Sequence, residues 1–281
     1  MPQPVFDALR EAVRNHRPAV LATVVEGPGV GDKVLVVEGQ EPVGRLADPD
    51  LDRVVIRDAE AALAAGATSM RHYGAQGQAN EEVASVFFEA FAPPPRLVIF
   101  GAVDFTAALV RVAKVLGYRV TVCDAREVFA TRARFPLADE VVVDWPNRFL
   151  DSLRPELGPR DAVCVLTHDL KFDIPAIVAA LSTEVGYLGA MGSRRTTEER
   201  TERLRAEGTT DAELARIMAP IGLDIGARTP EETAVAICAE IIAQRTGRPV
   251  ARLRDGQGPI HGPSSGRRSI RDGDRPGASP S

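Results

Sequence analysis

The chain has 281 residues, of which 44% are hydrophobic, and a formal net charge of −5. Its length allows two domains of ordinary size, and its acidic balance argues against nucleic acid as the main partner. No apolar run approaches the roughly 20 residues of a membrane span, and charges occupy the N-terminal stretch where a signal peptide would be apolar, so we expect a cytoplasmic protein without a membrane span.

Residues 1–92 are predicted to form a small α+β domain. The proline run at 93–95 sets its end, because such a run neither continues a helix nor lies inside a sheet. Periodicity predicts helices over residues 5–15 and 50–65, strands at AVLATVV, KVLVVEG, 68–73 and 83–91, and a glycine-rich turn at EGPGVGD.

Residues 93–246 are predicted to form a Rossmann-like, doubly wound parallel sheet, which makes the fold class α/β. The apolar runs RLVIFG, RVTVCD, EVVVDW, AVCVLT and EVGYLGAM are rich in valine, isoleucine and leucine with little alternation. This pattern is typical of strands buried on both faces. Helices are predicted over 104–116, 174–182 and 196–207.

The last predicted helix carries its own boundary signals. Thr229, Pro230 and Glu232 form a capping box with proline in the first turn, and Gly247 ends the helix. Its apolar face is predicted to be Val235, Ile237, Cys238, Ile241 and Ile242. The basic tail that follows, residues 247–281, has 17 glycine, serine or proline residues among 35 and is predicted to be disordered.

The three cysteines lie far apart, each inside an apolar run: Cys123, Cys164 and Cys238. A disulfide framework or a zinc site would need clustered spacing. We therefore expect buried, unreactive thiols and no metal site.

Polar residues follow several predicted strands, at the edge where doubly wound sheets bind ligands. Gly101 follows the first strand of the sheet. Asp124, which lies 23 residues later, is placed to accept hydrogen bonds from ribose hydroxyls, or simply to cap a tight turn. The loop between them departs from a dinucleotide fingerprint, because Val103 replaces the second glycine and Asp104 adds a negative charge. Binding of NAD(P) in the usual geometry is therefore not expected.

Two further strand ends supply candidate residues. His168 and Asp169, in LTHDLKFDIPAI, are the candidate catalytic pair, since a histidine at this edge is well placed for proton transfer. The segment GAMGSRR combines backbone amides at a helix start with guanidinium groups, which suits a phosphate or carboxylate; the alternative is a solvated glycine turn. Its cofactor-binding candidates are Gly189, Gly192, Ser193, Arg194 and Arg195.

Three stretches make the chain resemble the XdhC/CoxI family of xanthine dehydrogenase and CO dehydrogenase accessory proteins. They are LTHDLKFDIPA, YLGAMGSRRTTEER and APIGLDIGARTPEETAVAICAEI. The resemblance implies an XdhC/CoxI-type N-terminal domain, a Rossmann domain, and a role in binding molybdenum cofactor and handing it to a molybdenum hydroxylase subunit. Such a protein is a cofactor-binding chaperone more than a turnover enzyme.

The chain also departs from this family's pattern. The family's Gly-x-Gly-His-Val reads Gly101-Ala102-Val103-Asp104-Phe105, and the family's early Gly-Gly-Cys segment is missing, since no cysteine precedes Cys123. The resemblance therefore indicates a divergent member, which lacks the early thiol for handling cofactor sulfur in the family's usual way.

Three functions follow as hypotheses. The first is a maturation factor that binds molybdenum cofactor or a related nucleotide and docks on a molybdenum hydroxylase. The second is an NAD(P)-dependent oxidoreductase with His168 as proton donor and Asp124 selecting the ribose. The third is a non-catalytic nucleotide-sensing protein, and a homodimer is compatible with each.

Overall fold

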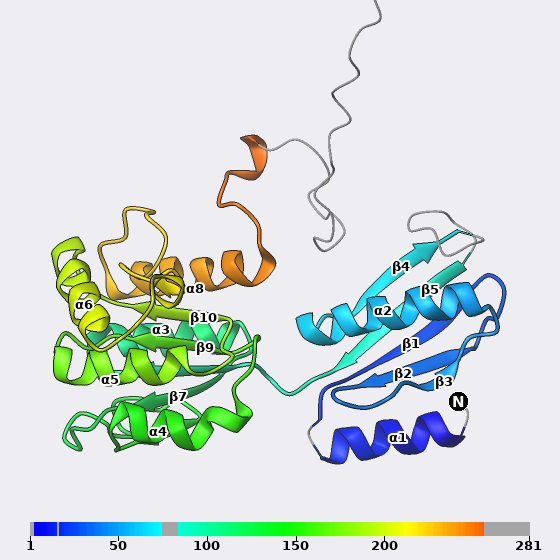
Figure 1. The fold of residues 1–281 in the computed structure, drawn as a ribbon, viewed down its shortest axis with the longest axis horizontal. Helices are drawn as coiled ribbons and strands as arrows, with labels where there is room; N and C mark the ends of the chain where they lie inside the picture. The colour runs from blue at the N-terminus through cyan, green and yellow to red at the C-terminus, as the bar shows by residue number, and fades with distance from the viewer. Residues whose placement is uncertain (1–2, 16, 75–83, 256–281) are drawn as a thin grey trace, which may run out of the picture.

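A computed structural model of the chain describes residues 3–15, 17–74 and 84–255. These residues form two sheets that lie side by side and are joined by the stretch between β5 (Ala84–Phe91) and β6 (Arg96–Phe100) (Figure 1). The change of sheet coincides with the proline run. The domain limits at 92 and 246 remain predictions.

The first sheet is antiparallel, in the order β3-β2-β1-β5-β4. Helix α1 (Gln3–Arg14) covers one face and α2 (Pro49–Ala65) the other (Figure 1). Because successive side chains of a strand point to opposite faces, Val20 packs with α2 and Leu21 with α1. The remaining strands are β1 (Ala19–Glu26), β2 (Lys33–Val37), β3 (Val43–Arg45) and β4 (Ser69–Tyr73).

The second sheet is parallel, in the order β11-β10-β9-β6-β7-β8. Helices α3 (Asp104–Val115) and α8 (Pro230–Thr246) cover one face, and α4 (Pro146–Leu153) and α5 (Leu170–Leu181) cover the other. The other strands are β7 (Arg119–Cys123), β8 (Glu140–Val142), β9 (Ala162–Val165), β10 (Tyr187–Ala190) and β11 (Ile217–Met218). The predicted α/β fold with a doubly wound parallel sheet is confirmed.

The winding of this sheet reverses at β6. The chain runs outward from β6 through β7 to β8, and then returns to place β9 on the other side of β6. The connections after β6 and β9 leave the sheet in opposite directions at this point, where doubly wound sheets commonly bind ligands. The reversal therefore marks the carboxyl edge near Gly101 and Thr167 as the first place to look for a site.

The ends of α8 are as predicted. The Thr229 hydroxyl accepts from the Glu232 amide at 3.2 Å, and the Glu232 carboxylate accepts from the Thr229 amide at 3.1 Å. Gly247 ends the helix in the left-handed conformation at φ 62°. The capping box and the glycine after the last turn therefore set the two ends of α8.

The predicted apolar face of α8 is wrong at two positions. Val235 is 49% exposed and Ile242 is 36% exposed, whereas Ala234 and Ala236 are buried. Small side chains let α8 pack closely on α3, so the buried face is chosen by fit to its neighbour rather than by side-chain size.

Several helix and strand limits differ from those predicted. Helix α5 starts at Leu170 and not at 174, because the Asp169 carboxylate caps it by accepting from the Lys171 amide at 2.9 Å. Helix α6 covers Arg194–Ala206. The elements that were not predicted are short: β3, α4, α7 (Asp211–Leu214) and β11.

Only part of the predicted disordered tail can be compared. Leu253–Asp255 form a short 3-10 helix, and residues 256–281 lie outside the described residues. Within the described ranges, no helix combines the length and the apolar character that crossing a membrane requires.

Candidate functional site

The segments that follow β6, β7, β9 and β10 lie along one edge of the parallel sheet, which we call the carboxyl edge. Backbone hydrogen bonds continue past the strands: the Met191 amide donates to the Val165 carbonyl at 2.8 Å, and the Gly101 amide donates to the Cys123 carbonyl at 3.0 Å. These bonds align the predicted segments at Gly101, Asp124, His168–Asp169 and Gly189–Arg195. The side chains within those segments have different surroundings.

Gly101 is required by close packing of two loops. Its φ is +108°, and a Cβ atom there would lie 2.9 Å from Thr167 Cγ2 and 3.0 Å from the Thr167 amide nitrogen. The Thr106 hydroxyl donates to the Gly101 carbonyl and accepts from the Val103 amide. The loop thus closes on itself and on the β9 loop, which gives no support to a hydride-transfer site of the usual dinucleotide geometry.

Asp124 is buried and its carboxylate is fully engaged. It accepts from the Ala102 amide at 2.8 Å, from the Arg126 amide at 2.9 Å, and from Arg126 Nε and Nη2 at 2.9 and 2.8 Å. Burial raises the pKa of Asp124, but these hydrogen bonds lower it further than burial raises it, so the group stays ionised. The carboxylate therefore holds two loops together, as the capping alternative describes, and ribose binding by Asp124 stays a prediction.

His168 and Asp169 have separate surroundings. Asp169 is the N-cap of α5, as described above, while the His168 side chain is exposed beside it. The structure records no hydrogen bond between these two residues among the contacts it describes. His168 remains available to a ligand, and Asp169 already serves the helix.

A buried ion pair under this edge was missed from the sequence. Arg200 Nη2 donates to Asp173 Oδ2 at 2.6 Å and to the Met191 carbonyl at 2.7 Å, and the Thr167 hydroxyl donates to the other oxygen of Asp173. The side chains of Asp173 and Arg200 are 1% and 2% exposed. Burial raises the pKa of Asp173, and the hydrogen bonds from Thr167 and Arg200 oppose that rise. The network ties α5 and α6 to the ends of β9 and β10.

The sequence offered one weak signal for this pair. Helix α6 reads RRTTEERTERLRA and is polar almost throughout, so it looks like a solvated helix. Arg200 and the buried Leu204 are four residues apart and so share a face. That face is the one turned inward.

The segment from Gly189 to Arg195 divides into a packed part and an exposed part. Gly189 lies inside β10, where a Cβ would come within 2.5 Å of Ile221 and 2.7 Å of the Tyr187 hydroxyl. A Cβ at Gly192 would lie 3.2 Å from Thr196. The remaining candidates all lie at the exposed start of α6: Ser193, Arg194 and Arg195.

Some polar groups at the start of α6 form hydrogen bonds with residues of the same segment. Ser193 Oγ accepts from the Thr196 amide at 3.1 Å, and Arg195 Nε donates to Glu199 at 3.0 Å. Arg194 makes no ion pair within the described part of the chain. The guanidinium groups of Arg194 and Arg195 therefore face solvent beside the carboxyl edge.

The three thiols are free and buried, as predicted. Burial raises the pKa of Cys123 to about 12 and that of Cys238 to about 11, and it raises the pKa of Cys164 as well. Thiolates are therefore scarce at neutral pH. No cluster of three or more His, Cys, Asp or Glu side chains suited to a metal ion occurs among the described residues.

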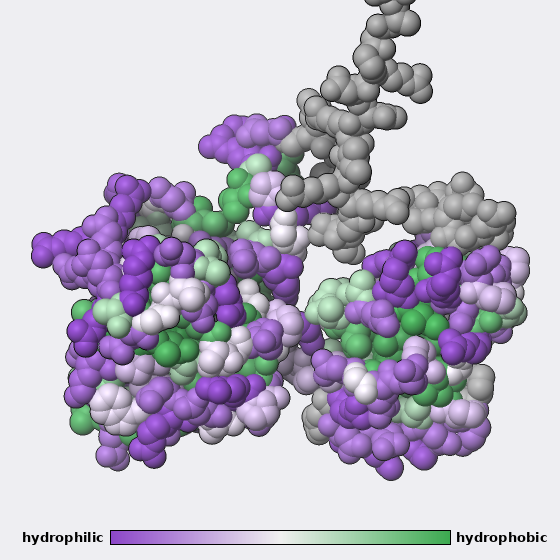
Figure 2. Space-filling model, viewed as in Figure 1, coloured by the Kyte–Doolittle hydropathy of each residue, from purple (hydrophilic) through white to green (hydrophobic). Residues whose placement is uncertain are grey.

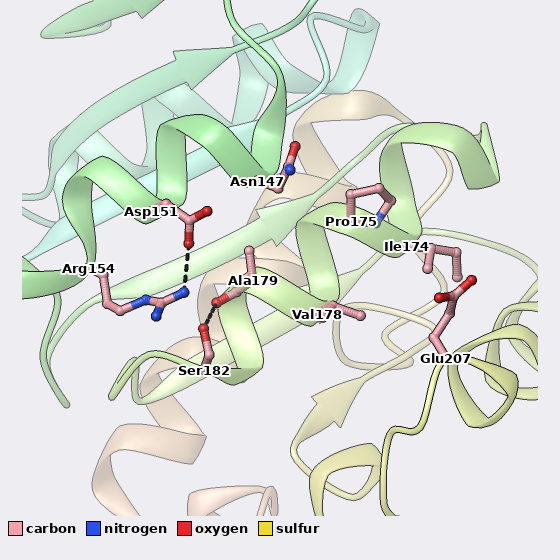
Figure 3. Close-up of a pocket in the computed structure, with 9 residues that line it drawn as sticks. All are labelled: Asn147, Asp151, Arg154, Ile174, Pro175, Val178, Ala179, Ser182 and Glu207. Atoms are coloured by element: carbon pink, nitrogen blue, oxygen red, sulfur yellow. Dashed lines mark hydrogen bonds and ion pairs between the residues drawn. The ribbon is translucent and has the colours of Figure 1, made fainter.

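A groove of about 510 Å³ lies away from the predicted site residues, between α4 and α5 (Figure 3). The Asp151 carboxylate accepts from Arg154 at one end, and Glu207 lies at the other end. Figure 2 shows apolar surface in the middle of the parallel-sheet half, where α5 lies, surrounded by hydrophilic residues. This groove belongs to the outer helical face and not to the carboxyl edge.

Comparison with known proteins extends over most of the chain. Residues 97–241 match the family described as XdhC Rossmann domain, and residues 12–74 match the XdhC and CoxI family. A solved structure from Bacillus halodurans, described as a xanthine dehydrogenase, has a TM-score of 0.51 at 22% identity over 88% of this chain and 97% of that chain. That likeness concerns the fold.

Two curated relatives match the chain over part of their length. A protein of Bacillus subtilis (strain 168) that is named as a probable subunit of xanthine dehydrogenase is 33% identical over 165 residues, 59% of this chain and 47% of the relative. "Molybdenum cofactor insertion chaperone PaoD" of Escherichia coli (strain K12) is 29% identical over 159 residues, 57% of this chain and 43% of the relative. The chain thus spans less than half the length of either relative. Since the Rossmann-domain match alone covers just over half of the chain, the chain belongs to the XdhC and CoxI family.

Proposed function

We propose that the chain acts in the maturation of a molybdenum hydroxylase, by binding molybdenum cofactor or a related nucleotide at the carboxyl edge and delivering it to the enzyme. The observation that carries this proposal is the match of residues 97–241 to the XdhC Rossmann domain, together with the likeness to a protein named as a molybdenum cofactor insertion chaperone. Delivery rather than turnover suits an edge at which Asp124 and Asp169 are engaged in holding the fold.

The chemistry of the edge fits the anionic part of such a cofactor. Arg194 and Arg195 present guanidinium groups to solvent at the start of α6, and a guanidinium binds phosphate through paired hydrogen bonds. His168 offers a ring nitrogen on the neighbouring loop. These three residues would hold the cofactor, which supplies the molybdenum centre for the client enzyme.

The same chemistry argues against sulfur handling by this chain. Its three thiols are buried and protonated at neutral pH, so none is presented to a ligand. We therefore propose binding and transfer of the cofactor without a cysteine in contact with it, in line with the absence of an early cysteine in the sequence.

A binding experiment tests this proposal. Molybdenum cofactor released anaerobically from a purified molybdoenzyme is titrated into the full chain by calorimetry. The Arg194→Gln/Arg195→Gln variant is expected to bind about tenfold more weakly, because it loses charge-assisted hydrogen bonds. Arg203→Gln is the matched control, since Arg203 lies on the same helix and pairs with Glu207 four residues on, as Arg195 pairs with Glu199.

The control should bind like the unaltered chain. Absence of cofactor binding by the unaltered chain, or equal loss in the control and the double variant, would contradict the proposed site. A second measurement tests delivery: apo-hydroxylase should regain activity faster with the cofactor-loaded chain than with the same amount of free cofactor.

A further inference from the structure

A row of aromatic rings lies at the part of the carboxyl edge beyond β7 and β8. Trp145 precedes α4, and Phe172 lies in the first turn of α5; their ring centroids are 5.2 Å apart with an interplanar angle of 42°. Phe129 comes from the connection between β7 and β8. Trp145 is 36% exposed and Phe129 41%, so the row faces solvent.

Cationic side chains lie over these rings. Lys171 Nζ is 5.1 Å from the Trp145 ring centroid and 5.6 Å from that of Phe172. Arg126 Cζ is 4.6 Å from the Phe129 centroid and 5.8 Å from that of Phe172. We call these five residues the ring shelf: Arg126, Phe129, Trp145, Lys171 and Phe172.

The two cations of the shelf differ in their anionic partners. Asp124 holds Arg126 through two of its nitrogens, which fixes the guanidinium between two rings. Lys171 has no ion pair within the described residues, whereas Lys114 is bound to Asp139 at 2.8 Å. In the part of the chain that the structure describes, Lys171 is thus a cation over aromatic faces that is not paired with a carboxylate.

This combination recognises a ring and an anion together. An exposed aromatic face stacks on any planar heterocycle, and a neighbouring cation binds its phosphate. A solvent-exposed cation–π contact is weak, so Lys171 can leave the rings to bind a phosphate. The whole chain has a net charge of −5 and repels anions at long range. An anionic ligand therefore needs local cations such as these.

We propose that the ring shelf binds a phosphorylated planar heterocycle, either a nucleotide or a phosphorylated pterin. The ring stacks on Trp145 and Phe172, and the phosphate contacts Lys171 and Nη1 of Arg126, the guanidinium nitrogen that Asp124 does not hold. The shelf is a second surface of the edge, separate from Arg194 and Arg195. The proposal therefore goes beyond the proposed function, and it stands whichever ligand those two arginines bind.

The chain contains its own probe for this site. Trp145 is the single tryptophan in the sequence, so its fluorescence reports on the shelf in the unaltered full chain. GMP, guanosine, inorganic phosphate and a phosphorylated pterin are titrated separately, with correction for absorption by the ligand. We expect saturable quenching by GMP or the phosphorylated pterin, weaker binding of guanosine, and no quenching by phosphate alone.

Variants separate the charge from the rings. Lys171→Gln should raise the Kd of GMP about fivefold to tenfold, and Lys114→Gln, the matched loss of a lysine charge, should leave it unchanged. Phe172→Leu should raise it by a similar factor, through loss of stacking. Trp145→Leu removes the fluorescent signal and is followed by calorimetry, with circular dichroism of each variant as the check on folding.

The outcomes are decisive in each direction. Saturable quenching by GMP or by the phosphorylated pterin supports the shelf. The one with the lower Kd shows whether its ligand is a nucleotide or a pterin. The inference is overturned if neither ligand quenches saturably, or if guanosine quenches as well as GMP and Lys171→Gln has no effect. Loss of shelf binding with cofactor binding intact would leave the proposed function standing, and the reverse result would leave only the shelf.

Discussion

The two halves of the carboxyl edge use similar residues in opposite ways. At the ends of β6, β9 and β10, the polar groups of Thr167, Asp173 and Arg200 bond to one another and are buried. Beside the ends of β7 and β8, the ring of Trp145 and the side chain of Lys171, which reaches that ring from the first turn of α5, stay exposed. A polar residue at a strand end is therefore not by itself a ligand residue; its protein partners decide.

The difference has a topological cause. The winding reverses between β6 and β9, so the two central connections start side by side, and Gly101 touches Thr167. The side chains of Thr167, Asp173 and Arg200 are buried there, so their charges and hydroxyl group depend on protein partners. β7 and β8 lie further from the centre of the sheet, and side chains beside their ends meet solvent. We expect substitutions in the central half to cost stability and those in the outer half to cost binding.

The largest effect is expected at the buried ion pair. Arg200→Met leaves the buried Asp173 without its cationic partner, which should lower the free energy of unfolding by about 3–5 kcal/mol. Urea denaturation followed by circular dichroism measures this loss. Arg200→Met/Asp173→Leu should recover a good part of it, because no lone charge remains; a double variant as unstable as the single one would mean that the network does more than neutralise charge.

A smaller loss is expected at the crossing of the central loops. Gly101→Ala adds a Cβ 2.9 Å from Thr167 Cγ2 to a backbone with φ +108°, and should cost about 3 kcal/mol by strain and overlap together. Gly117 is the matched control, since its φ is +81° and nothing lies within 4 Å of the added Cβ. Gly117→Ala should cost about 1–2 kcal/mol. Equal losses in thermal or urea denaturation would show that the close approach is unimportant.

Asp124, at the junction of the two halves, is expected to make stability depend on pH. Its folded-state pKa lies below the ordinary value, so its contribution is complete above about pH 4, the pKa of an unfolded aspartate, and is lost as the pH falls through the folded-state pKa. Asp124→Asn should lower the free energy of unfolding by about 1–2 kcal/mol at pH 7, a figure reduced because Arg126 is 43% exposed.

Below pH 4 the difference between Asp124→Asn and the unaltered chain should shrink. Unfolding curves recorded between pH 7 and pH 3 follow it. A difference that stays constant over this range would indicate that Asp124 acts through packing and not through its charge.

The smallest effect on stability is expected in the outer half. Lys171→Gln should change the free energy of unfolding by no more than about 0.5 kcal/mol, because the side chain is exposed and has no ion pair within the described ranges. Urea denaturation beside Arg200→Met provides the contrast. A loss of 2 kcal/mol or more, on the scale of a buried group, would remove the distinction between the two halves.

Local signals predicted the parts of the fold that depend on neighbours in sequence. The capping box at Thr229 and Glu232 needs only residues three apart, and it gave the start of α8 correctly. The start of α5 was predicted too late at 174, although Asp169 is also a local cap. Pro175 lies inside this helix, within its first two turns, where proline is better tolerated than in the helix centre. Short elements such as β11 carry too few residues to show a period.

The candidate site depended more on distant partners. That Gly101, Asp124 and the Gly189–Arg195 segment would share an edge followed from the prediction that the strands before them are parallel. The sequence did not show which of these residues would stay accessible to a ligand, because their partners are set by the fold. Asp124 is engaged by Arg126 and Ala102, and Gly189 is enclosed by Ile221 and Tyr187. The ring shelf joins residues from three connections, and no single stretch of sequence displays it.

The sequence by itself determined that the second part of this chain forms a doubly wound parallel sheet with its functional candidates at the carboxyl edge, because strand burial and helix caps are encoded by residues close together. Only the tertiary structure decided that Arg200 is buried against Asp173, that Gly101 is held by Thr167, and that Lys171 lies over Trp145. Burial and pairing are set by the groups that surround a side chain in space. Those groups come from strands and helices that only the completed sheet brings together.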